Sequence, residues 1–245
     1  KTIQRVEDTE LKIYLPKIVD HAVFIQLHQV QVDLYNKFSE LVAKNSTNTN
    51  KRGFLSDFSI FQYICTHPHL LAVMENLRNK KIRERDLITD EQEDNPMCNI
   101  EGWWKAVVPE DAAEKIEYGH KLMVVKSIIE ECEEIGDKVL VFSQSLGELN
   151  LIEHFLEKEG TSNCHSWKKK IDYCRMDGTV PPALRSTICD LFNDKDNKTL
   201  RLLLMSTKVG GLGLNLTAAN RVIIMTVNWN PSYDIQSVFR VYRFG

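Results

Sequence analysis

Short apolar runs alternate with longer amphipathic runs through the second half of the chain, and this alternation limits the folds open to it. Helical spacing of Leu, Ile and Phe over 146–159 and the pair Pro181-Pro182 predict two of the helices between the runs. The four strand candidates are 138–143, 172–176, 201–205 and 221–225. Apolar strands separated by helices predict an α/β fold, with a doubly wound parallel sheet over 119–245.

The first part of the chain lacks this alternation. We expect a strand over 22–28, a helix over 30–42 and mostly helical structure over 54–74. Charged residues crowd the stretch 78–118, which predicts a polar and poorly packed insert. Residues 1–118 are therefore expected to form a helical region that precedes the sheet.

Composition excludes several classes of protein. The 245 residues are 43% hydrophobic and 27% charged, which is typical of globular chains and not of disordered or fibrous ones. No stretch reaches the roughly 20 apolar residues of a membrane span, so no membrane partner is expected. The sequence begins with Lys1 rather than Met, and we expect it to be a piece of a longer protein. Six cysteines without CxxC spacing indicate reduced thiols in the cytosol or nucleus.

The net charge of −3 is unevenly distributed along the chain. Residues 195–245 carry seven basic and two acidic side chains, a balance of +5, so the rest of the chain carries −8. Basic residues gathered in one segment suit a phosphate-bearing partner. An ordinary surface with uneven charge is the alternative interpretation.

Loops after the predicted strands hold the candidate binding residues, because ligands of open α/β sheets bind beyond the carboxyl ends of the strands. The most informative loop is 206–215, Ser-Thr-Lys-Val-Gly-Gly-Leu-Gly-Leu-Asn. Its glycines let the backbone approach a ligand closely, and Ser206, Thr207 and Lys208 offer donors to phosphate. A structural need for tight turns would also explain the glycines.

Two arginines follow, one in the last predicted helix, 233–242, and one directly after it. Gln236, Arg240 and Arg243 recur at spacings of four and three, which predicts that they share a helix face. A guanidinium can neutralise charge that develops on a γ-phosphate, although a surface salt-bridge network would suit the same spacing. The sequence has no Gly-Lys-Ser/Thr P-loop and no Asp-Glu pair ending an apolar strand. It therefore offers residues for completing an ATP site and none for building one.

Five motifs resemble helicase motifs IV to VI of superfamily two. They are Val-Leu-Val-Phe-Ser-Gln at 139–144, Arg-Met-Asp-Gly at 175–178, the loop 206–215, Trp-Asn-Pro at 229–231 and Gln-Ser-Val-Phe-Arg-Val-Tyr-Arg-Phe-Gly at 236–245. The chain resembles the C-terminal RecA-like lobe of Swi/Snf-type chromatin-remodelling ATPases, and their ATRX-like branch most of all. The likeness implies a lobe-one connection and helical protrusion over 1–118, and over 119–245 a RecA-like lobe that stops within motif VI.

The resemblance implies roles for the matching residues. Arg240 and Arg243 would be the catalytic arginine fingers, and Gln236, Gly211 and Gly213 would face the nucleotide. Seven residues would follow or guide the DNA, namely Ser143, Gln144, Gly178, Ser206, Thr207, Lys208 and Trp229. After Gly178 the chain departs from the family, with Thr-Val where Ser-Thr is usual.

The resemblance also implies a function for the longer protein, an ATP-dependent double-stranded DNA translocase that remodels chromatin in the nucleus. ATP and Mg²⁺ would be held mainly by an N-terminal RecA-like lobe outside this sequence. That lobe, double-stranded DNA and the histones of nucleosomes would be the partners. The present chain by itself would hydrolyse no ATP.

Two other classes of function stay open. A non-catalytic nucleic-acid or protein interaction module could retain the lobe, and an upstream sequence without a P-loop would favour it. A dinucleotide-dependent enzyme is disfavoured, because no acidic residue ends a strand about 20 residues after the glycine loop. No metal site is predicted, because neither the group Cys65, His67, His69 nor the group Cys164, His165, Cys174 supplies the four ligands of structural zinc.

Overall fold

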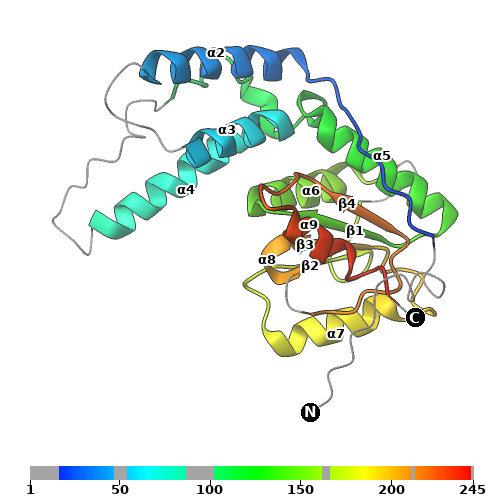
Figure 1. Ribbon diagram of the computed structural model, residues 1–245. Helices are drawn as coiled ribbons and strands as arrows, with labels where there is room; N and C mark the ends of the chain where they lie inside the picture. The colour runs from blue at the N-terminus through cyan, green and yellow to red at the C-terminus, as the bar shows by residue number, and fades with distance from the viewer. Residues whose placement is uncertain (1–16, 47–53, 87–101, 162–165, 211–212, 244–245) are drawn as a thin grey trace. The chain divides into compact units, whose positions relative to one another are not determined.

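The computed structural model describes residues 17–46, 54–86, 102–161, 166–210 and 213–243 (Figure 1). These residues form two compact units. The first comprises Phe24–Ser127, and the second comprises the residues from Ile128 onward together with 17–23. No helix among the described residues is long and apolar enough to cross a membrane.

A four-stranded parallel sheet with the order β2-β3-β1-β4 forms the centre of the second unit. Its strands are β1 (Val139–Ser143), β2 (Tyr173–Met176), β3 (Leu202–Ser206) and β4 (Arg221–Ile224). The central strands β1 and β3 are buried along their whole length, whereas β4 at one margin is partly exposed. The predicted parallel α/β sheet is confirmed, with every strand within one residue of its predicted bounds.

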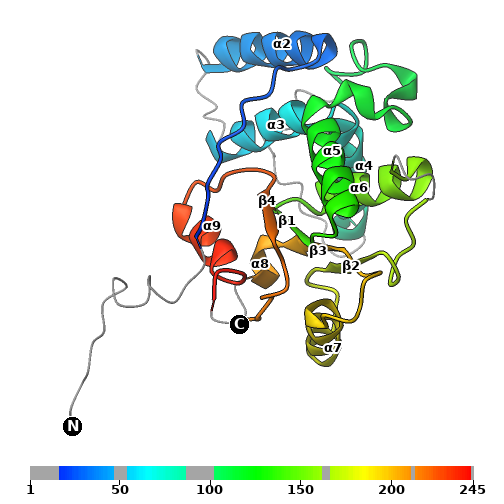
Figure 2. The same cartoon turned by 90° about the vertical axis from the view of Figure 1, so that its right-hand side faces the viewer.

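Helices cover both faces of this sheet (Figure 2). Successive strand residues point to opposite faces. On one face, Phe142 and Met205 pack with Phe192 of α7 (Pro182–Asn193) and Val209 of the single turn α8 (Thr207–Gly210). The other face meets α6 (Leu146–Glu159). Two further helices flank the strands in sequence, α5 (His120–Ile135) before β1 and α9 (Pro231–Val238) after β4.

The first unit is helical. It contains α2 (Gln29–Ser46), α3 (Phe54–Thr66), α4 (His69–Asp86) and two short 3₁₀ helices, Glu110–Ala113 and Ile116–Tyr118. Its core joins Leu34 and Phe38 of α2 to Ile64 of α3 and Leu71 of α4. The helices predicted over 30–42 and 54–74 are confirmed.

Two parts of this unit differ from the sequence predictions. The strand predicted over 22–28 is wrong: the segment is irregular and Phe24 is 96% exposed, because strand propensity gives a strand only where a neighbour completes the hydrogen bonds. Within the predicted insert 78–118, the described residues are better packed than expected. There α4 continues to Asp86, and the ring of Trp103 stacks 5.1 Å from that of Phe38. Residues 87–101 lie outside the described residues.

A buried histidine and a glycine fix the entry to α5. Nδ1 of His67 accepts the N–H of His69 at 3.2 Å, so Nε2 carries the proton and donates to the carbonyl of Lys115 at 3.0 Å. Burial lowers the pKa of His67 from 6.5 to about 4 and keeps the ring neutral. A Cβ on Gly119 would lie 2.5 Å from Cδ2 of His67 and 2.6 Å from the carbonyl oxygen of Thr66. Only glycine fits there without movement of the ring or the backbone.

Gly119→Ala should destabilise the helical unit by about 1–3 kcal/mol, because the added methyl group displaces buried atoms. Gly178→Ala is the matched control, since a Cβ there would meet nothing within 4 Å. Urea unfolding followed by tryptophan fluorescence measures both variants. Equal stability of the two would contradict the packing described at Gly119.

Candidate functional site

The four strands end at one level, which brings four loops to the same edge of the sheet, the carboxyl edge. Met176 pairs with Met205, Met205 with Phe142, and Phe142 with Ile224. The loop residues that follow are neighbours along this edge in the order Asp177-Gly178, Ser206-Thr207-Lys208, Ser143-Gln144 and Met225-Thr226. Nε2 of Gln144 donates to the carbonyl of Thr226 at 3.3 Å and continues the alignment beyond the strands.

The predicted DNA-binding residues differ in exposure. Gln144, Gly178 and Lys208 are exposed, and Trp229, a few residues beyond β4, is 72% exposed. The buried members are Ser143, Ser206 and Thr207. The exposed group is open to contact with a ligand, whereas the buried side chains lie inside the edge.

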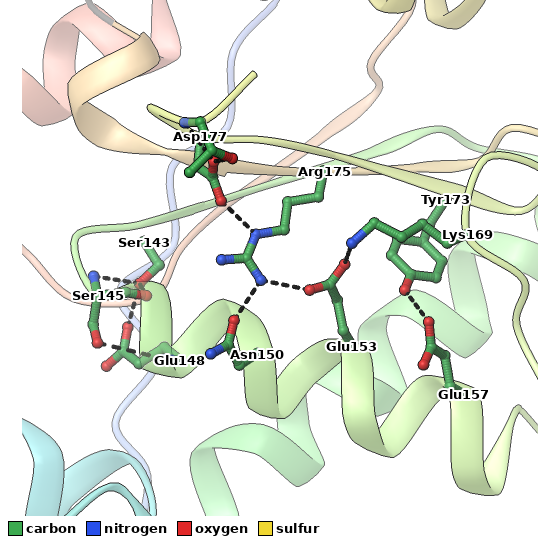
Figure 3. Close-up of polar contacts among 11 residues, drawn as sticks. Ser143, Ser145, Glu148, Asn150, Glu153, Glu157, Lys169, Tyr173, Arg175 and Asp177 are labelled. Atoms are coloured by element: carbon green, nitrogen blue, oxygen red, sulfur yellow. Dashed lines mark hydrogen bonds and ion pairs between the residues drawn. The ribbon is translucent and has the colours of Figure 1, made fainter. Parts of the chain in front are cut away.

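The hydroxyl of Ser143 is used inside the protein. It donates to Oε2 of Glu148 at 2.6 Å, and Glu148 is buried in the first turn of α6 (Figure 3). Oε1 of Glu148 accepts the hydroxyl of Thr226 at 3.4 Å. One carboxylate therefore ties the ends of β1 and β4 to the N-terminus of α6, where the helix dipole favours negative charge.

Asp177 shapes the loop after β2. Its Oδ1 accepts the N–H of Thr179 at 2.9 Å and the hydroxyl at 2.6 Å, and Oδ2 accepts Nε of Arg175 at 2.8 Å. Burial raises the pKa of this carboxyl, but the bonds from Thr179 and the charge of Arg175 outweigh burial, so the pKa is lowered from 3.8. The stability that this charge contributes is present above the unfolded pKa and is lost as the pH falls through the folded pKa. Gly178 lies exposed at the tip of the turn.

Arg175 connects this loop to α6 (Figure 3). Its Nη1 donates to Oδ1 of Asn150 and to Oε2 of Glu153, both at 2.5 Å. Oε1 of Glu153 also pairs with Nζ of Lys169 at 2.6 Å. The side chains of Arg175 and Glu153 are each only 12% exposed, so each charge depends on its partners rather than on water.

The C-terminal arginines lie differently from the prediction. α9 ends at Val238, so the helix predicted over 233–242 is too long and the three polar residues do not share a helix face. The N–H of Arg240 bonds three residues back, to the carbonyl of Ser237 at 3.2 Å, and this tighter turn ends the helix. Arg240 is buried, whereas Gln236 is exposed on α9.

The turn brings both arginines to the loop after β3. The carbonyl of Arg240 accepts the N–H of Leu216 at 3.0 Å. The guanidinium of Arg243 bonds to Oδ1 of Asn215, and its Nε donates to the carbonyl of Phe239 at 2.7 Å. The loop 206–215 with Leu216 and the segment 236–245, which are far apart in the sequence, are thus joined by direct contacts.

Positive charge accumulates beside this loop. Gly213 has a φ of +76°, and a Cβ on it would lie 4.0 Å from Nη1 of Arg240. Burial and the nearby charge of Arg243 lower the pKa of Arg240, which an arginine tolerates without losing its proton. Two guanidinium groups beside exposed loop backbone fit the oxygens of a polyphosphate. Gly211 lies outside the described residues.

The described residues contain no group of three or more His, Cys, Asp or Glu side chains that could hold a metal ion. Mg²⁺ prefers oxygen ligands, and the carboxylates of Glu148, Glu153 and Asp177 are already bonded to protein donors. The chemistry of this edge therefore suits phosphate groups better than a divalent cation.

Three residues that build this edge were not predicted as site residues, Glu148, Glu153 and Arg175. The sequence does single out Arg175, because a charged residue inside a strand of a sheet that is covered on both faces needs a buried partner. Glu148 stands three positions after Ser145, the spacing of a capping box, and the hydroxyl of Ser145 accepts its N–H at 3.4 Å. The partner of Arg175, by contrast, could have been any acidic residue on α6.

A helicase conserved C-terminal domain model matches residues 120–245, which include the whole sheet and its carboxyl edge. The match covers more than half of the chain, and the chain belongs to this family of helicase domains. Within the family it is an ATRX-like C-terminal lobe of the SNF2 class, as the motifs predicted.

The relatives are much longer than this chain. It is 48% identical over 163 residues to human "Transcriptional regulator ATRX", which covers 62% of the chain and 6% of that protein. Over 99% of the chain it is 29% identical to "Protein CHROMATIN REMODELING 20" of Arabidopsis thaliana and 32% identical to "Helicase ARIP4" of Mus musculus. Those alignments cover 18% and 20% of the two relatives, so the chain spans about a fifth of their length or less.

Solved structures show the same fold. The C-terminal part of the Fun30 ATPase domain is 20% identical, with a TM-score of 0.61 over 95% of this chain and 82% of that one. The C-terminal domain of the Sulfolobus solfataricus SWI2/SNF2 ATPase is 24% identical, with a TM-score of 0.56 over 86% and 72% of the two chains. The RecA-like α/β lobe is therefore confirmed.

Arg175→Met should destabilise the sheet unit by about 3–5 kcal/mol, because it leaves the buried carboxylates of Glu153 and Asp177 without their shared partner. Arg221→Met is the control, since its pair with Asp137 is more exposed and contributes about 0–1 kcal/mol. Urea unfolding followed by circular dichroism measures both variants. Similar small losses would contradict the role of Arg175.

Proposed function

We propose that this chain is the second motor lobe of an ATP-dependent double-stranded DNA translocase that remodels chromatin. The loop 206–215 carries the proposal. Lys208 lies exposed at one end of the loop, on the carboxyl edge, and Asn215 at the other end bonds to Arg243. A single short segment thus joins a candidate DNA contact to a candidate nucleotide contact.

ATP binds, in this proposal, between the present lobe and an N-terminal RecA-like lobe, whose P-loop holds the phosphates and Mg²⁺. Arg240 and Arg243 act as the arginine fingers, and Gln236, Gly211 and Gly213 face the nucleotide. Support comes from the two guanidinium groups beside the loop, since charge developing on the γ-phosphate is stabilised by positive groups fixed in place beforehand. Burial and the turn after α9 hold Arg240 in place.

DNA lies along the carboxyl edge in this proposal. Neighbouring strands are about 4.8 Å apart, so four strand ends span roughly 14 Å, a length suited to several phosphates of one strand. Gly178, Lys208 and Gln144 offer exposed donors in that order along the edge, and Trp229 guides the strand beyond β4. Ser143, Ser206 and Thr207 support these contacts from inside.

In this proposal the two lobes close around ATP and open after hydrolysis. They bind one DNA strand in alternation, so the duplex is moved past them in steps. The names of the relatives, a transcriptional regulator and a chromatin-remodelling protein, favour nucleosomes and their histones as the substrate, and the nucleus as the location. The chain alone, without the P-loop lobe, then hydrolyses no ATP.

Arg243→Ala in the full-length protein should lower DNA-stimulated ATP turnover by about 10³-fold or more while ATP affinity stays close to wild type. The reason is that Arg243 contributes mainly in the transition state, whereas the other lobe makes the ground-state contacts. Arg243→Lys should not restore turnover, because a point charge lacks the planar fork. Single-turnover hydrolysis and nucleotide titration measure the two quantities.

Asn215→Ala is the matched control for Arg243. It removes the same hydrogen bond and keeps the guanidinium, so turnover should stay within a few-fold of wild type. If Asn215→Ala and Arg243→Ala lose turnover and thermal stability equally, Arg243 only fastens the chain end and is not an arginine finger.

Lys208→Ala should weaken binding of duplex DNA similarly for all sequences and reduce the slope of log affinity against log salt by about 1, because it removes one phosphate contact. Lys208→Arg should retain most of the affinity. Fluorescence anisotropy at several salt concentrations measures the slope. An unchanged slope, or a loss confined to one DNA sequence, would contradict the backbone contact.

A further inference from the structure

A second group of basic side chains lies at the opposite edge of the same sheet, where the strands begin. We call it the amino edge and define it by the exposed residues Lys168 and Lys170 before β2 and Lys195 and Lys198 before β3. Neither the arginine fingers nor the carboxyl edge uses these residues.

The two segments of the amino edge are neighbours. The N–H groups of Arg201 and Leu202 both point to the carbonyl of Asp172, at 2.9 and 3.3 Å. Nζ of Lys138, at the start of β1, donates to the carbonyls of Phe192 and Asp194 at 2.6 and 2.9 Å, which fastens the end of α7 beside the same strands. The segments before β2 and β3, with their lysines, therefore lie at the same edge of the sheet.

Hydrogen bonds order the two loops that carry these exposed lysines. Oδ1 of Asn197 accepts the N–H groups of Thr199 and Leu200 and the hydroxyl of Thr199, at 2.9–3.2 Å. Oδ2 of Asp172 accepts the N–H of Lys168 at 2.7 Å. Fixed loops present charge to a ligand with less loss of entropy on binding.

Lys170 has a strained backbone. Its φ is 70°, and it is the one residue other than glycine with a positive φ among the residues described. This conformation costs a residue with a Cβ about 1–2 kcal/mol, and glycine or asparagine would adopt it more easily. The N–H of Lys170 bonds to the carbonyl of Tyr173 at 2.7 Å, so the turn is ordered despite the strain. A lysine at this strained position is therefore a candidate for a functional charge.

The composition of the amino edge favours phosphate over protein. Over 166–172 and 194–201 the chain has six basic and three acidic residues. Lysine is depleted at protein–protein interfaces, where aromatic residues and arginine provide the affinity. The one aromatic residue in these two stretches, Trp167, is buried. Exposed lysines without exposed aromatic residues among them are typical of sequence-independent contact with a phosphate backbone.

We propose that the amino edge binds the backbone of a second segment of duplex nucleic acid, separate from the segment at the carboxyl edge. β1 and β3 are five residues long, so about 16 Å of strand separates the two edges. A straight duplex that lies along the carboxyl edge, across the strands, does not reach the amino edge. The lobe therefore joins two duplex segments, or two turns of one bent duplex. The amino-edge contact itself does not depend on the function proposed above, whereas the joining of two segments rests on it.

The direct test removes the four charges. In a Lys208→Ala background, changing Lys168, Lys170, Lys195 and Lys198 to Gln should lower the affinity of the chain for a 30-base-pair duplex and reduce its salt slope by about 3–4. Changing the same four residues to arginine should leave both the affinity and the salt slope close to those of the Lys208→Ala background. Loss of affinity with glutamine but not with arginine supports the proposal, even if Lys208 proves unimportant. Unchanged affinity and slope with glutamine would overturn it.

The joining of segments has its own test. With Lys208 intact, the wild-type chain should capture a fluorescent duplex on a biotinylated one, and the four-glutamine variant should bind one duplex but capture no second. Capture by the glutamine variant would overturn the assignment to this edge. Polyglutamate serves as a probe for an acidic protein partner. If it binds the wild-type chain but not the four-glutamine variant, while both bind duplex equally, the amino edge recognises an acidic protein and the proposal is overturned.

Lys170→Gly distinguishes the contribution of the Lys170 charge to DNA binding from its contribution to stability. Glycine relieves the strain, so the variant should be at least as stable as wild type in urea, while its duplex affinity falls about two-fold to five-fold in the Lys208→Ala background. Lys17→Gly, at another exposed lysine of the same unit, is the control and should bind as the background does. If Lys170→Gly also binds as the background does, the strained lysine has no part in binding.

Discussion

Parallel pairing is the constraint on which the candidate site depends. Because Met176, Met205, Phe142 and Ile224 pair across the sheet, the loops after all four strands leave from one level. A slip of one residue in any strand would exchange its two faces, placing Ser143 or Arg175 among apolar side chains and away from α6. β1 and β3 are apolar on both faces, so burial alone would not prevent that slip. The hydrogen bonds of Ser143 and Arg175 to α6 would be lost in it, and they hold the register at the functional edge.

Charge inside the lobe serves the same alignment. Arg175 and Glu148 connect the ends of β2, β1 and β4 to α6, and neither is free to meet a ligand in this arrangement. The residues left exposed between them, such as Gln144 and Gly178, are those with spare donors or open backbone. The buried ion pairs therefore act as positioning contacts, and their cost in desolvation is offset by bonds to more than one partner.

Much of the fold could be predicted from the sequence, and the reasons for the failures are physical. β1 and β3 could be predicted because a run of Leu, Val and Met without charge must be buried. The irregular conformation of 22–28 could not be predicted. Its residue pattern resembles a strand, and whether a strand forms depends on a neighbouring strand that completes its hydrogen bonds. For the site, loop positions followed from strand order, but the burial of Arg240 did not, because the last helix ends at Val238 through a local turn that spacing alone does not reveal. The pairing of Arg175 with Glu153 depends on tertiary contacts between β2 and α6.

The central claim, that the carboxyl edge carries the DNA, is tested most directly by photo-crosslinking in the full-length protein. A photoreactive amino acid placed at Gln144 or Lys208 should crosslink to duplex DNA, and the yield at both positions should change when a non-hydrolysable ATP analogue closes the lobes. The same group at the exposed His154, in the middle of α6 and away from both edges of the sheet, should give background yield. Equal yields at all three positions, or none at Gln144 and Lys208, would contradict the account.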